Sequence, residues 1–223
     1  LIGMFNLRLN WVEVFSWHNW GDRLGKFQLK MLGGSAFAPL ARSVPPMLSE
    51  EGLHLLIGYQ GTQRMLQAGR VPIDVHQRYF NRILSASYDG FGGEQSRHAQ
   101  RTYEWGLKPP YVTADETAEP VEPFGLNEVA RRAFMEEVES IIRTTLNRLL
   151  PPDSPKLFLT DPRFNRTNGP YKGKLYDPHG NLLTAEEWAA ALPEMLPTAA
   201  DEALLREVFR DPDWIAAPAR AQA

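Results

Sequence analysis

With 223 residues, 43% of them hydrophobic and 23% charged, the chain is long enough for one domain with a substantial core, or one domain with a small appendage. Its net charge of −3 gives no basis for a nucleic-acid or membrane partner, and no run of about 18 apolar residues predicts a membrane span. Cysteine is absent, which excludes disulfides, zinc–thiolate sites, cysteine nucleophiles and iron–sulfur clusters held by this chain, and fits a cytoplasmic location.

The first predicted element is a long helix over residues 2–32, in which apolar residues recur every three to four positions. Asp22 lies in this helix among aromatic and aliphatic neighbours. Gly21 and Gly25 flank it, and such small residues allow either close approach of a second helix or a local bulge. His18, one turn before Asp22, is interpreted as a buried, hydrogen-bonded histidine, with a metal ligand or a partner of one as the alternative.

The second helix is predicted over residues 45–68, because Pro45 and Pro46 are tolerated in a first helical turn. It carries Glu51 and His54, which share one face because residues i and i+3 are neighbours on a helix. Di-iron helix bundles hold metal with such a Glu-x-x-His and a lone carboxylate from a neighbouring helix. Asp22 precedes Glu51 by 29 residues, enough for a turn and an antiparallel return. Asp22, Glu51 and His54 are therefore the candidate metal ligands.

The alternative to a metal centre is a solvated glutamate beside an unrelated, satisfied histidine. The residues around Glu51 and His54 argue against it, because an apolar sequence predicts a buried face on which unpaired charge is costly. These residues are Leu53, Leu55, Leu56 and Ile57. Glu50, at i−4 from His54, is the alternative to Glu51. We prefer Glu51 because di-iron bundles use the i, i+3 spacing.

Residues 1–108 are predicted to form a helical half-bundle that carries one half of a di-iron site. After the two helices above, it contains a third helix over residues 72–88 and a polar, basic helix over residues 95–107. Several basic residues are candidates for an anion-binding patch, with a solvated face as the alternative. They are Arg78, Arg82, Arg97, Arg101 and Lys108.

The second half of the chain is predicted to be less regular. Residues 109–126 form a proline-rich linker, and residues 127–150 form an amphipathic helix that packs on the bundle and is capped by Asn127. Residues 151–223 form a C-terminal extension. Within it, we predict a strand over residues 156–159 and a β-hairpin over residues 174–183. We also predict a short helix that begins with a capping box of Thr184 and Glu187, and a second short helix over residues 202–209.

Asp22, the following gap and Glu51-x-x-His54, with the adjoining GYQGTQRMLQAGRVPIDVHQRYFNRILSASYDGFGGEQS, resemble the C-terminal half of the oxygenase component of benzoyl-CoA 2,3-epoxidase. The stretch LFLTDPRFNRTNGPYKGKLYDPHGNLLT resembles the C-terminal extension of the same family. The resemblance implies a mainly α, partial ferritin-like di-iron bundle. In that family, each of two helix pairs supplies one lone carboxylate and one Glu-x-x-His, and Asp22, Glu51 and His54 match the second set.

The first set of ligands has no match in this chain, so we expect it upstream of Leu1. The chain opens inside an apolar helical pattern without a signal peptide, which predicts an N-terminally truncated fragment. Half a ligand set predicts that the chain alone retains iron weakly and is not fully active. Beyond the metal ligands, no residue is assigned a catalytic or cofactor-binding role.

The resemblance also implies an activity. Members are O2-dependent di-iron monooxygenases that convert benzoyl-CoA to its 2,3-epoxide in aerobic benzoate degradation. Their electrons come from NADPH through a separate flavin and iron–sulfur reductase, and the lack of cysteine agrees with a relay on another chain. The alternatives are a di-iron subunit of the phenylacetyl-CoA epoxidase type and a non-catalytic helical interaction subunit.

Overall fold

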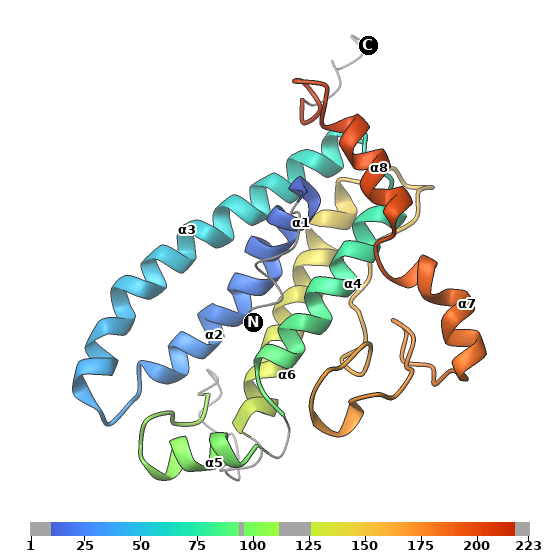
Figure 1. Ribbon diagram of the computed structural model, residues 1–223. Helices are drawn as coiled ribbons and strands as arrows, with labels where there is room; N and C mark the ends of the chain where they lie inside the picture. The colour runs from blue at the N-terminus through green and yellow to red at the C-terminus, as the bar shows by residue number, and fades with distance from the viewer. Residues whose placement is uncertain (1–9, 94–95, 112–125, 217–223) are drawn as a thin grey trace.

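The computed structural model of the chain describes residues 10–93, 96–111 and 126–216, and within these ranges it contains helices and no β-strand. The first rod consists of α1 (Trp11–Ser16), a π-helical segment η2 (Trp17–Gly21) and α2 (Asp22–Leu32), which follow one another without a break. α3 (Ala38–Ala68) runs back beside this rod (Figure 1). The mainly helical fold is confirmed, while residues 2–9 of the first predicted helix lie outside the described residues.

The start of α3 differs from the prediction. The helix begins at Ala38, and the proline in its first turn is Pro39. Pro45 and Pro46 therefore lie inside the helix, where each removes one backbone N–H donor. Both prolines are exposed, so water reaches this part of the helix and can bond to the carbonyl groups that lose a partner. The predicted end at Gly69 is confirmed, and its φ of 65° is the left-handed conformation that favours glycine.

α4 (Ile73–Gly90) and α6 (Leu126–Thr144) form a second layer against the first rod (Figure 1). Aromatic side chains join the layers: Trp20 packs edge-on against Phe80 at 5.2 Å between ring centroids, and Phe27 packs edge-on against Phe134 at 6.0 Å. This packing buries η2 and α2 along one side. The rod that carries Asp22 is thus supported from behind by the largest hydrophobic cluster of the described residues.

The predicted cap of α6 is wrong. Because the helix already begins at Leu126, Asn127 lies inside it, where its buried side-chain oxygen accepts a hydrogen bond from Lys108 Nζ at 3.3 Å. The helix also ends earlier than predicted, at Thr144, and a short 3₁₀ segment η4 (Leu146–Arg148) follows.

α5 (Arg97–Glu104) lies at the end of the molecule where α2 turns into α3 (Figure 1). The backbone N–H of Ala36, in that turn, donates to the carbonyl of Gly106 at 2.7 Å. Most of the predicted proline-rich linker, residues 112–125, lies outside the described residues. The division of the chain into half-bundle, linker, helix and extension stays a prediction.

The C-terminal extension contains the 3₁₀ segment η5 (Gly169–Tyr171) and the short helices α7 (Ala185–Met195) and α8 (Ala199–Val208), which lie on the outer side of α4 (Figure 1). The capping box of Thr184 and Glu187 is confirmed, since each side chain bonds to the other residue's backbone N–H. No helix found in the described residues is long and apolar enough to cross a membrane.

The predicted strand and β-hairpin of the extension are wrong. Residues 174–183 contain a single antiparallel bridge, between Tyr176 and Leu182, and Leu182 is 65% exposed, so the pairing does not extend into a two-stranded sheet. Residues 156–159 do not pair with a strand because side chains bind their backbone. The N–H of Leu157 donates to Asn147 Oδ1 and that of Phe158 to Gln77 Oε1, both at 2.9 Å.

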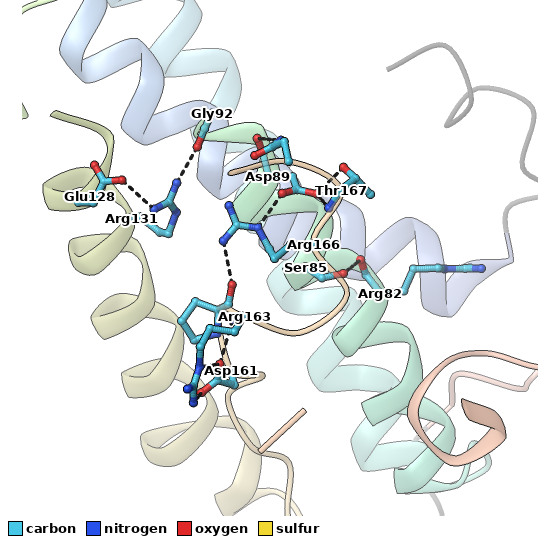
Figure 2. Close-up of polar contacts among 12 residues, drawn as sticks. Arg82, Ser85, Asp89, Gly92, Glu128, Arg131, Asp161, Arg163, Arg166 and Thr167 are labelled. Atoms are coloured by element: carbon cyan, nitrogen blue, oxygen red, sulfur yellow. Dashed lines mark hydrogen bonds and ion pairs between the residues drawn. The ribbon is translucent and has the colours of Figure 1, made fainter. Parts of the chain in front are cut away.

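A polar network fixes the extension to α4 (Figure 2). The carboxylate of Asp89 accepts from Arg166 Nε at 2.6 Å, and from the backbone N–H and the hydroxyl of Thr167 at 2.7 and 2.6 Å. Arg131 of α6 donates to the carbonyl of Gly92, just beyond α4, at 2.7 Å. Hydrogen bonds to ionised groups are the stronger ones, so α4 is held firmly between α6 and the extension.

Candidate metal centre

The two rods bring the three predicted ligands together. Asp22 is the first residue of α2, directly after the π-helical segment, and Glu51 and His54 lie near the middle of α3. His54 Nδ1 is 3.7 Å from Asp22 Oδ2 and 3.5 Å from Glu51 Oε2. The residues that the sequence pattern selected therefore meet at one place between antiparallel helices.

His18 joins this cluster from the turn before Asp22. Its Nδ1 is 2.6 Å from Asp22 Oδ2, and its ring centroid is 5.5 Å from that of His54. Donor atoms of His18, Asp22 and His54 all lie within 4.8 Å of one another. The interpretation of His18 as hydrogen-bonded is confirmed. Its side chain is only partly buried, however, and it faces the candidate ligands instead of the core.

The backbone just before Asp22 is unusual. Across η2 the N–H of Asp22 bonds to the carbonyl of Trp17, five residues earlier, which is the hydrogen bond of a π-helix. Single π-helical turns are rare and occur frequently at functional sites. Gly21 fits this segment, because a Cβ there would lie 2.8 Å from the ring of Trp17. The local bulge predicted from the flanking glycines is thus present.

Glycines also allow the rods to approach each other. A Cβ at Gly25 would lie 2.5 Å from Glu51 Oε1, and one at Gly58 would lie 2.6 Å from the carbonyl carbon of His18. At Gly58 the neighbouring atoms include backbone, which cannot move aside, whereas at Gly25 they belong to the end of the flexible Glu51 side chain. The close approach of the two helices therefore depends on Gly58.

The cluster brings two carboxylates close together in a partly buried place. Burial raises the pKa of Glu51, and the nearby negative charge of Asp22 raises it further. Glu51 Oε2 is buried and lacks a hydrogen bond, and His54 Nδ1 lies 3.5 Å from it. Two carboxylates with two imidazoles suit a divalent transition-metal ion, so the residues present fit an iron ion.

Glu50 is a poorer ligand than Glu51. Its side chain is exposed, whereas that of Glu51 is directed toward the helix carrying Asp22, where it contacts the Gly25 position. The geometry therefore favours the i, i+3 pair of Glu51 and His54 over the i, i+4 pair.

The apolar residues beside the candidate ligands are not buried as expected. Leu53, Leu56 and Ile57 are 58%, 48% and 43% exposed, and the side chain of His54 is 46% exposed. No helix of the described part of the chain covers this side of α3 (Figure 1). The candidate centre is thus supported on the α4–α6 side and open on the other, where it adjoins an apolar surface.

The five basic residues do not form one patch. Arg78 pairs with Asp201 on α8, and Arg82 with Glu13 on α1, so both are neutralised within the chain. Lys108 is largely buried, and burial lowers its pKa to about 8. The other two, Arg97 and Arg101, are exposed on α5.

The fold and the cluster define a helical protein with a carboxylate–histidine centre between two antiparallel helices. No protein-family model matches the chain. The chain is similar to benzoyl-CoA oxygenase component B from Aromatoleum evansii, with 28% identity over 261 aligned positions that cover 95% of this chain and 55% of that protein. The chain thus spans about half the length of this curated relative, and the resemblance noted from its sequence is confirmed.

Proposed function

We propose that this chain forms the C-terminal half of the oxygenase component of a di-iron, O2-dependent epoxidase that converts benzoyl-CoA to its 2,3-epoxide. The observation that carries the proposal is the convergence of Asp22, Glu51 and His54 from two antiparallel helices, in a chain similar to a benzoyl-CoA oxygenase component. When bound, the iron centre would supply the activation of O2. Asp22, Glu51 and His54 would hold one iron in a ferritin-like bundle.

The open side of α3 supports the second part of the proposal. Leu53, Leu56 and Ile57 lie exposed next to His54. Burying such a surface is favourable by roughly 25 cal/mol per Å2 of apolar area. We propose that a helix pair from the preceding part of the protein packs there and carries the other lone carboxylate and Glu-x-x-His. The relative's greater length leaves room for such a pair.

The chain's residues would then have separate tasks. Asp22 and Glu51 neutralise the metal charge, and His54 sets the direction of one coordination position. The apolar residues beside His54 would exclude water from the space in which the benzoyl ring reacts. NADPH electrons would arrive from a separate flavin and iron–sulfur reductase, because this chain has no cysteine with which to hold an iron–sulfur cluster.

The test uses the full-length protein in which this chain occurs. We expect about two irons per chain, and O2 consumption that requires benzoyl-CoA, NADPH and a reductase. Asp22→Ala and Glu51→Ala should each lower both the iron content and the activity, whereas Glu50→Ala, one residue away and exposed, should leave both unchanged. An iron-free protein whose behaviour is unaffected by either ligand change would point instead to a non-catalytic helical subunit.

A further inference from the structure

His18 is in a position that the family pattern does not assign. That pattern gives each half of the site a lone carboxylate and a Glu-x-x-His, which Asp22, Glu51 and His54 already supply. We propose that His18 is an additional ligand beside Asp22, Glu51 and His54, so that this chain binds one divalent transition-metal ion more tightly than half a ligand set predicts. The inference rests on the metal centre of the proposed function and is independent of its substrate.

The distances suit one shared ion. With metal–ligand bonds of about 2.1 Å, two donors in a tetrahedral site lie roughly 3.4 Å apart. The separations are 2.6 Å from His18 Nδ1 to Asp22 Oδ2, 3.7 Å from Asp22 to His54, and 3.5 Å from Glu51 to His54. The donors of His18, Asp22 and His54 all lie within 4.8 Å of one another, so one ion can reach these three, and Glu51 adjoins them through His54.

The backbone explains why the imidazole of His18 lies where it can bind an ion together with Asp22. Residues 18 and 22 lie within and directly after the π-helical segment, so their side chains are held side by side at the surface that faces α3. Gly58 on α3 lies against the backbone of His18, and this contact brings His54, one turn earlier on the same helix, close to the imidazole. His18 therefore lies beside the second helix, as Asp22 does.

The donor set also indicates the class of ion. Two imidazoles and two carboxylates suit Zn2+, Co2+ or Fe2+, whereas Mg2+ and Ca2+ prefer oxygen ligands alone. A divalent ion would balance the charges of Asp22 and Glu51 and would give the buried Glu51 Oε2, which has no hydrogen bond, a ligand bond. A hydrogen bond between His18 and Asp22 alone leaves Glu51 Oε2 with only the 3.5 Å contact to His54.

The chain alone, titrated with Co2+ at neutral pH, tests this inference. We expect one Co2+ per chain, with visible absorption bands of a four- or five-coordinate ion. His18→Ala and His18→Gln should each weaken binding at least about tenfold and change these bands. Glutamine retains a hydrogen bond to Asp22, so a loss in both variants separates metal ligation from that bond. His98→Ala, which removes an exposed histidine on α5, is the matched control and should bind as the unchanged chain does.

Circular dichroism of each variant shows whether the helices remain folded. Equal Co2+ affinity in a folded His18→Gln variant and in the unchanged chain would overturn the inference, and so would the absence of any Co2+ binding by the chain. Binding that depends on His18, combined with no benzoyl-CoA turnover by the full-length protein, would refute the proposed substrate and leave this inference standing.

Discussion

Replacing Gly58 by alanine tests whether close helix contact builds the centre. A Cβ at this position would lie 2.6 Å from the carbonyl carbon and 2.7 Å from the Cβ of His18, and it would lie closer still to the backbone nitrogen of Asn19. These distances are roughly 1 Å below an ordinary carbon contact. Two of the three atoms belong to the backbone, so the helices themselves must separate.

Gly52→Ala provides a matched control in the same helix. A Cβ at Gly52 meets nothing within 4 Å, so this change gains only helix propensity, worth roughly 0.5–1 kcal/mol in the free energy of unfolding. Both variants share that gain, and their difference isolates the cost of the clash. Overpacking typically costs about 1–3 kcal/mol, and a backbone contact favours the upper part of that range.

Urea unfolding followed by circular dichroism measures the difference in the free energy of unfolding. We expect Gly58→Ala to be less stable than Gly52→Ala by about 1–3 kcal/mol, with similar m-values. Its Co2+ affinity should also fall, because a helix shift of roughly 1 Å moves Glu51 and His54 away from Asp22. A Gly58→Ala variant as stable as Gly52→Ala would refute the reasoning that this contact positions the two helices.

Two further predictions concern buried polar groups. Burial lowers the pKa of His76 to about 4 from 6.5. Between these pH values the unfolded chain therefore binds more protons than the folded chain. The free energy of unfolding should fall by roughly 3 kcal/mol as the pH drops from 6.5 to 4. The urea concentration at the unfolding midpoint, measured at several pH values, should decline less toward acid for His76→Phe than for the unchanged chain. Parallel curves for the two proteins would show that His76 does not cause the pH dependence. Arg78→Ala should lower the free energy of unfolding by about 3–5 kcal/mol, because it leaves the buried carboxylate of Asp201 without its cation. Thermal unfolding measures this loss. The control Arg210→Ala removes an exposed ion pair and should barely change the unfolding temperature.

The candidate ligands could be predicted because their signal is local. Glu51 and His54 are three residues apart on one helix, and this spacing alone places them on one face. The gap to Asp22 allowed an antiparallel return. The glycines beside Asp22 allowed either a close helix approach or a bulge, and the structure has a π-helical segment that ends at Gly21.

The position of His18 beside the candidate ligands was harder to predict, because it depends on an irregular helical turn and on a contact with a second helix. The turn is the π-helical one before Asp22, and the contact is that of Gly58 with the backbone at His18. The spacing of four residues from Asp22 was visible in the sequence. That spacing alone does not distinguish a ligand from a histidine that packs in the core.

The errors in the rest of the fold have similar causes. We predicted that the second helix starts at Pro45 because proline is tolerated in a first helical turn. The helix instead starts at Ala38, with Pro39 in its first turn, and the exposed Pro45 and Pro46 lie inside it. The short apolar run in residues 156–159 predicted a strand, yet the side chains of Gln77 and Asn147 take hydrogen bonds that a neighbouring strand would make. Such long-range competition is not visible in a local pattern.

The location of bound iron tests the central claim most directly. Crystals of the protein, prepared with ferrous iron and without oxygen, would give an anomalous difference map at the iron absorption edge. We predict a peak between α2 and α3, with oxygen atoms of Asp22 and Glu51 and a ring nitrogen of His54 within about 2.0–2.2 Å. A fully loaded protein whose iron peaks all lie away from these three side chains would contradict the account.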